Sequence, residues 1–316
     1  MKGVECPMRS VMQRILITGA TGFIGGQLAA ELARRGDEVV ALTRRPSVAR
    51  LPKGVRPVGW TATEAGDWFA EVSGTDAVIH LAGEQAVGVR WTEETKRRMT
   101  ESRVTSTRQL VAAMKQAQAR PKVFVCASAV GYYGDRGKNE ALTEDAQPGS
   151  DFLATLTQQW EEAATAAEDL GVRVVRVRFG IVLGAGGGAL EEMAKPFRLF
   201  AGGPIGSGKQ MISWISVEDT VRAVCFVLDH DSISGPVNVV APNPVDNERL
   251  SKEIGKALSR PSWLRVPEAA LRLRFGEGAD PLLTGQRVRP AVLERAGFSW
   301  HHPELSAALS AAFAGP

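Results

Sequence analysis

Residues Thr18 to Gly25 read TGATGFIG and decide the fold. They follow a short apolar run, residues 14–17, and precede a helix-like run that begins at Gly26. A glycine at the first position lets the chain turn sharply out of a strand, the second lets backbone N–H groups approach a pyrophosphate, and the third lets the helix pack closely on the sheet. The order of strand, turn and helix therefore predicts dinucleotide binding rather than an ordinary glycine turn. The residues expected at the cofactor phosphates are Gly19, Thr21, Gly22, Phe23, Ile24 and Gly25.

The rest of the chain alternates between short apolar, β-branched runs and segments with helical periodicity. This alternation predicts a doubly wound parallel sheet of the Rossmann type in the α/β class, with its ligand at the carboxyl ends of the strands. The expected strands are residues 13–18, 38–43, 76–81, 122–128 and 172–178, and the clearest helical segments are 92–118 and 153–170.

After about residue 180 the sequence pattern changes. Glycine-rich loops at 184–188 and 202–208 are followed by helical patterns near 217–229 and 246–258. We therefore expect three parts, namely a tail, a dinucleotide-binding domain, and a smaller C-terminal substrate lobe that interleaves with the end of the sheet. Their expected bounds are 1–12, 13–180 and 181–316.

The amino-acid composition limits the classes of partner and ligand that we expect for this chain. The 316 residues include 38 basic and 35 acidic side chains, for a net charge of +3, so neither nucleic acid nor a membrane surface is the expected partner. Three widely spaced cysteines fit a reducing compartment, which predicts a cytoplasmic protein. The four histidines show no metal-ligand spacing, so no metal site is expected.

The dinucleotide is indicated by the end of the second expected strand. An acidic residue about 20 positions after the glycines would accept hydrogen bonds from the ribose 2′-hydroxyl of NAD. This chain carries Thr43, Arg44 and Arg45 there instead. A guanidinium suits a 2′-phosphate in charge and geometry, which favours NADP. The alternative is that both arginines are solvated loop charges.

The third of the expected strands ends in HLAGE, residues His80 to Glu84. This position predicts that the backbone of Leu81, Ala82 and Gly83 lies beside the cofactor, while His80 has a structural role. Glu84 and Arg90 are candidates to cover the cofactor phosphates or the substrate.

Several motifs together resemble a known family. The TG start with GxxGxxG spacing resembles the extended short-chain dehydrogenase/reductases. HLAGE, ESRV, SAVGYYG, RFGIVLGAGGGAL, GGPIGSGKQMISWISVED and GQRVRPAVLERAGF resemble, within that group, the NAD-dependent epimerase/dehydratase-like epimerase family proteins. Those proteins carry a C-terminal domain of unknown function and are sometimes labelled cell-division inhibitors. The resemblance covers roughly residues 13–310 and implies a Rossmann fold that binds NADP.

The resemblance also implies a catalytic pattern from which this chain departs. Enzymes of the superfamily use a serine, a tyrosine and a lysine four residues after the tyrosine. Ser128 occupies the position of the serine, but residues 150–157, where YxxxK would stand, contain neither tyrosine nor lysine. The tyrosines of the chain are Tyr132 and Tyr133, so the catalytic candidates are Ser128, Tyr133 and then Tyr132.

Lys209 and Trp214 stand in a segment that faces the substrate in related enzymes, so both are candidates for the substrate wall. The alternative for Trp214 is a position in the core. Many extended relatives form dimers, which leaves a homodimer as an open expectation.

Two functions follow. The first is an epimerase/dehydratase-like oxidoreductase that uses NADP(H) on an unidentified small molecule with an atypical site. The second is a non-catalytic protein that binds NADP(H) and reports its presence to a partner, a hypothesis motivated by the missing tyrosine and lysine.

Overall fold

The structure is a computed structural model that describes residues 11–314. Most of the tail expected at residues 1–12 lies outside the described residues, as does Cys6. A seven-stranded parallel sheet forms the centre, in the order β11-β7-β5-β4-β1-β2-β3. The strands are β1 Arg14–Thr18, β2 Glu38–Thr43, β3 Val55–Gly59, β4 Ala77–His80, β5 Val123–Ala129, β7 Arg173–Phe179 and β11 Gly235–Val239. The predicted Rossmann-type sheet is confirmed.

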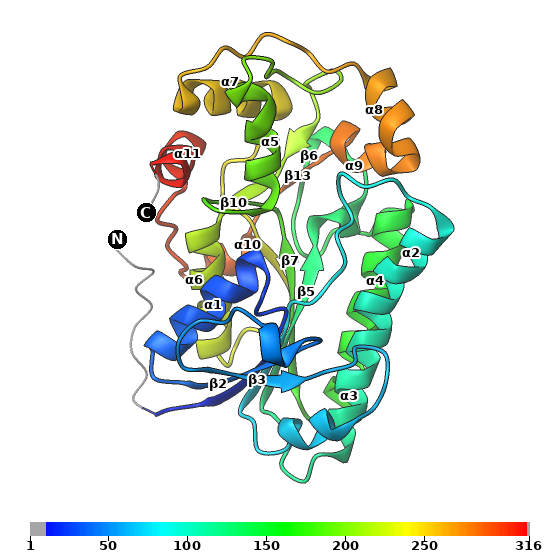
Figure 1. The fold of residues 1–316 in the computed structure, drawn as a ribbon, viewed down its shortest axis with the longest axis vertical. Coiled ribbons are helices and arrows are strands. Elements are labelled where there is room, and N and C mark those ends of the chain that lie inside the picture. Colours follow the sequence, from blue (N-terminus) through cyan, green and yellow to red (C-terminus); the bar gives the residue numbers. More distant parts are fainter. Residues whose placement is uncertain (1–10, 315–316) are drawn as a thin grey trace.

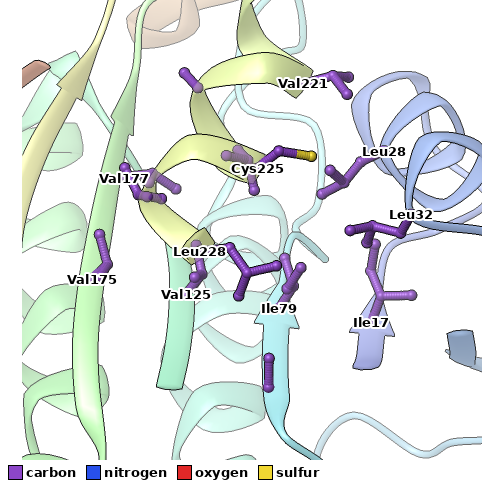
Figure 2. Close-up of a cluster of buried hydrophobic side chains, with 14 of the residues drawn as sticks. Ile17, Leu28, Leu32, Ile79, Val125, Val175, Val177, Val221, Cys225 and Leu228 are labelled. Carbon is purple, nitrogen blue, oxygen red and sulfur yellow. The ribbon is translucent and has the colours of Figure 1, made fainter. Parts of the chain in front are cut away.

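Helices cover both faces of the sheet (Figure 1). Alternate strand residues point to opposite faces, so each strand feeds two apolar cores. One core packs against α1 Phe23–Arg34 and α6 Val217–Asp229, and the other against α3 Ser106–Gln116 and α4 Phe152–Thr165. Figure 2 shows the first core, where Leu32 of α1 lies against Ile17 of β1 and Leu28 of α1 lies beside Cys225 of α6.

Two strands of the sheet had no counterpart among the predicted strands. The edge strand β3 contains a proline and exposes Arg56 and Pro57, so its sequence does not alternate clearly. The opposite edge strand, β11, begins Gly235-Pro236 and directly follows the turn after α6. Both are edge strands, where an apolar run on both faces is not required.

The segment expected to be one helix over 92–118 is divided. It consists of α2 Glu93–Thr100, a π-helical turn over Glu101–Thr105, and α3. Turns of this kind often occur at functional sites. Here the turn lies next to the end of β4, because Ser102 Oγ accepts a hydrogen bond from Glu84 N at 3.0 Å.

The strand β6 Gly137–Leu142 of the dinucleotide-binding part pairs with β13 Gln286–Val288 of the C-terminal lobe. The lobe itself contains the small strand pairs of β8 Ile181–Leu183 with β10 Trp214–Ser216 and of β9 Met211–Ile212 with β12 Val245–Asp246. Its helices are α5 Gly188–Arg198, α7 Asn247–Leu258, α8 Glu268–Phe275, α9 Asp280–Leu283, α10 Ala291–Arg295 and α11 Leu305–Phe313. The chain crosses between lobe and sheet, since α6 and β11 lie between lobe segments. Between residues 11 and 314, no helix has the length and apolarity needed to cross a bilayer.

Candidate cofactor and active site

The glycine turn after β1 is held by close backbone contacts. Gly19 has φ +76°, in the left-handed region, and its carbonyl accepts a hydrogen bond from Gly22 N at 2.9 Å. A Cβ built on Gly25 would lie 2.2 Å from that same carbonyl oxygen, and one on Gly22 would lie 3.2 Å from it. Side chains at these two positions would therefore fill or displace the turn.

The turn leads into the N-terminus of α1, whose N-cap Gly22 provides no side-chain hydrogen bond. The N–H groups of the first helical turn lack intrahelical acceptors, and the helix dipole favours an anion at this end. The ring of Phe23 packs against the glycine loop before α5, since a Cβ on Gly188 would lie 2.8 Å from it. Phe23 and Ile24 begin α1 and are half-buried, and Thr21 before them is exposed.

A buried hydrogen-bond relay fixes the end of β4 against this turn. Leu81 N and Ala82 N each donate to Thr18 Oγ1 at 3.2 Å, so the hydroxyl proton goes to His80 Nδ1 at 2.6 Å. His80 Nε2 then donates to Ser106 Oγ at 3.0 Å. Burial lowers the pKa of His80 to about 3, which keeps the ring neutral. The structural role expected for His80 agrees with this geometry.

The last residue of β2 is Thr43, and the strand is followed by Arg44 and Arg45. Both arginines are exposed, and within residues 11–314 neither has an ion-pair partner. Two guanidinium groups therefore lie in the loop directly after β2, the strand next to β1, on the side where the ribose of a bound dinucleotide is expected.

The loop after β4 lies between the phosphate turn and the π-helical turn. A Cβ on Gly19 would lie 2.9 Å from Ala82 N, so this stretch of backbone is in contact with the turn. Gly83 is exposed, and Glu84 is held through its backbone by Ser102 and Arg103. Arg90 instead reaches the C-terminal lobe, where it donates to the Leu273 carbonyl of α8 at 3.3 Å.

Ser128 lies at the end of β5 and is 3 % exposed. Its hydroxyl donates to Glu161 Oε1 of α4 at 2.5 Å. Glu161 in turn forms a bidentate ion pair with Arg178 of β7, at 2.7 Å from Nε and 2.8 Å from Nη2. This pair could not be predicted from sequence, because its members lie on different elements. The serine hydroxyl is therefore occupied by a buried carboxylate.

Tyr133 is fully buried, which corrects its assignment as a residue that meets a substrate. Its hydroxyl donates to Asn238 Oδ1 at 2.7 Å and accepts from Arg178 Nη1 at 2.9 Å. Burial raises the pKa of Tyr133 to about 12, so the phenol keeps its proton. Tyr132 is half-buried, with its ring centroid 3.5 Å from the Arg178 guanidinium carbon. These observations place Tyr133 in the core.

Trp214 is also fully buried, and its indole N–H donates to the Asn243 carbonyl at 3.0 Å. It belongs to the core of the C-terminal lobe, with Leu190 and Leu250, and has no surface to offer a ligand. The core alternative therefore replaces its assignment to the substrate wall. Lys209 is exposed.

A depression of about 420 Å³ lies along α4, lined by Tyr132, Glu161, Glu162, Thr165 and Arg176 among others. Arg176 is in the middle of β7, so this hollow runs along the flank of the sheet and not across the strand ends. No group of three or more potential metal ligands was found among residues 11–314.

Comparison with known proteins agrees with this geometry. The model of the NAD dependent epimerase/dehydratase family matches residues 15–240, and that of DUF1731, a domain of unknown function, matches residues 266–312. The chain belongs to the NAD-dependent epimerase/dehydratase family. An epimerase family protein of Mycobacterium leprae is 40 % identical over 304 residues, which are 96 % of each chain. A chloroplastic epimerase family protein of Arabidopsis thaliana is 40 % identical over 301 residues, 94 % of this chain and 86 % of that one.

Among solved structures, the human epimerase family protein SDR39U1 with NADPH has a TM-score of 0.84 and 34 % identity. The match covers 95 % of this chain and 98 % of the human one. This family member thus has the same fold over nearly its whole length.

Proposed function

We propose that this epimerase/dehydratase family member binds NADP(H) and exchanges hydride with a small molecule. The observation that carries the proposal is the glycine turn with the uncapped N-terminus of α1, set beside the free guanidinium groups of Arg44 and Arg45. The turn fits the diphosphate, and the arginines fit the 2′-phosphate. The NADPH in the human relative supports the same choice of cofactor.

When bound, the cofactor supplies the hydride chemistry, and the protein's task is to orient the ring and the substrate. Thr18 accepts hydrogen bonds from the backbone of Leu81 and Ala82 and so fixes its position. We expect this backbone to line one side of the cofactor site. Ser128 and Tyr133 are not placed to exchange protons with a substrate, because each hydroxyl is engaged inside the protein. The proposed chemistry therefore does not pass through a serine and tyrosine pair.

The test is transfer of deuterium. The protein is incubated with NADPH deuterated at C4 and a small-molecule extract, and products are searched by mass spectrometry for the label. With NADPH kept near the dissociation constant of the wild type, we expect deuterium in one class of product with the wild-type protein and much less with a Gly25→Ala control, whose cofactor affinity is weakened.

The hydrogen bonds of the Ser128 and Tyr133 hydroxyls favour a second candidate function, in which the protein senses NADPH. If NADPH binds tightly and no label moves to any product, the protein senses the cofactor without using it. The engagement of Ser128 by Glu161 and of Tyr133 by Asn238 supports this candidate. Binding of a partner protein that depends on NADPH would then be the expected readout.

A further inference from the structure

A half-buried cation lies at the edge of the proposed cofactor site, in the π-helical turn between α2 and α3. This is Arg103, whose Nη2 donates to the Glu84 carbonyl at 2.8 Å. Its guanidinium carbon lies 5.2 Å from the ring centroid of Trp160. Trp160 precedes Glu161, the residue that holds Ser128. Arg103 therefore joins the loop after β4 to α4.

The charge of Arg103 is not balanced inside the protein. No carboxylate oxygen of residues 11–314 lies within 4.0 Å of its guanidinium, although Glu84 attracts it from farther away. The hydrogen bonds of the guanidinium go to two main-chain carbonyls, of Glu84 and Met99. Burial lowers the pKa of Arg103 to about 10, because the loss of water penalises the charged form.

The guanidinium is also within reach of a ligand. Gly83 is exposed, and a Cβ built on it would lie 3.3 Å from the Arg103 guanidinium carbon. In the parallel pairing of β4 with β5, His80 lies opposite Cys126. The residues that follow β4 therefore leave the sheet at about the height of Ser128. A molecule that extends from the phosphate turn toward Ser128 therefore passes Gly83 and the cation behind it.

We propose that Arg103 binds an anionic oxygen of the substrate, so that the substrate class is small molecules with a carboxylate beside the reacting carbon. The inference rests on the proposed function, because it places this group next to a bound nicotinamide. A guanidinium fork matches a carboxylate with two parallel hydrogen bonds. The cofactor phosphates are the other source of anionic oxygen, but the turn at Gly22 and α1 already suits them.

The test uses oxalate as the carboxylate probe, with neutral oxamide as its control. Calorimetric titration of the NADP⁺-saturated protein gives the oxalate affinity of the wild type and of Arg103→Met, Arg103→Lys and Arg108→Met. Arg108 is exposed on α3, directly after the π-helical turn, and serves as the matched control. We expect Arg103→Met to weaken oxalate binding by about tenfold or more, Arg103→Lys to restore part of it, and Arg108→Met to leave it unchanged. Oxamide should not bind.

Labelling of the wild type with phenylglyoxal needs no variant that might misfold. Oxalate should slow modification of Arg103, read by mass spectrometry, and should not affect Arg108. Three results overturn the proposal: no oxalate binding by the wild type, equal oxalate affinity in Arg103→Met, or no protection of Arg103. A loss of NADPH affinity of about tenfold in folded Arg103→Met also overturns it, because the charge then pairs with the cofactor. Failure of the wild type to bind NADPH would instead refute the proposed function.

Discussion

At the scale of single residues, close approaches of the backbone decide what the site can hold. The contact between Gly25 and the Gly19 carbonyl leaves no room for a side chain, whereas Gly26 has only an ordinary contact with Ala20. These roles of the fingerprint glycines could be predicted from sequence, because spacing alone determines which residues face the turn.

Gly25→Ala should therefore reduce NADPH affinity by about tenfold or more, since the new methyl group must displace the turn that holds the diphosphate. Fluorescence titration with NADPH measures this. Gly26→Ala is the matched control, with its Cβ 3.4 Å from the Ala20 carbonyl oxygen, and should bind NADPH like the wild type. Equal affinity in Gly25→Ala would show that phosphates bind elsewhere.

The pair of Ser128 and Glu161 allows a second prediction. Ser128→Ala removes one hydrogen bond but leaves Glu161 paired with Arg178, so unfolding free energy should fall by only about 1 kcal/mol. Glu161→Gln leaves the buried Arg178 without its counter-charge and should cost about 3–5 kcal/mol. Urea unfolding distinguishes the two variants. A Glu161→Gln protein as stable as Ser128→Ala would contradict the structural role of the ion pair.

At the scale of elements, predictions succeeded where a pattern is local. The five central strands and α6 repeat apolar residues at fixed spacing, and the structure has them within a residue or two. The π-helical turn was missed because Glu101–Thr105 has ordinary helical composition, and its hydrogen bonds to the loop after β4 come from a distant part of the chain. Sequence periodicity does not report such contacts.

One buried carboxylate joins the sheet to the C-terminal lobe. Glu144 Oε1 accepts hydrogen bonds from Asn238 N of β11 at 3.0 Å and from Val292 N of α10 at 3.1 Å. Burial raises the pKa of the Glu144 carboxyl, since its ionised form loses more hydration than these bonds return. Protonation therefore favours the folded state.

A raised folded-state pKa gives stability that is fully present below the unfolded pKa and is lost as pH rises through the folded pKa. Glu144→Gln cannot ionise, so its stability relative to the wild type should be higher at about pH 7.5 than at about pH 4. Urea unfolding at both pH values measures the difference. Glu140→Gln, on exposed β6, is the control and should show no such change. A pH-independent difference for Glu144→Gln would contradict the assigned burial effect.

At the scale of the whole molecule, the site is assembled from segments that no motif connects. Ser128, Glu161 and Arg178 come from β5, α4 and β7, and Tyr133 reaches Asn238 on β11. Tyr133 and Trp214 lie in glycine-rich surroundings that resemble a binding loop, yet both side chains fill cores. Tertiary packing decides whether such an aromatic residue faces a ligand, so the phosphate turn was predictable and the reacting side of the site was not.

We propose that this fold selects NADP(H) through the glycine turn and the arginines after β2. The most direct measurement is titration of the wild-type protein with NADPH and with NADH, repeated on Arg44→Ala/Arg45→Ala, with Arg50→Ala as an exposed control on the same loop. We predict that NADPH binds at least about tenfold more tightly than NADH to the wild type and to Arg50→Ala, and that the double variant loses this preference while keeping its NADH affinity. Equal affinities for the two cofactors in the wild type, or an unchanged preference in the double variant, would contradict the account.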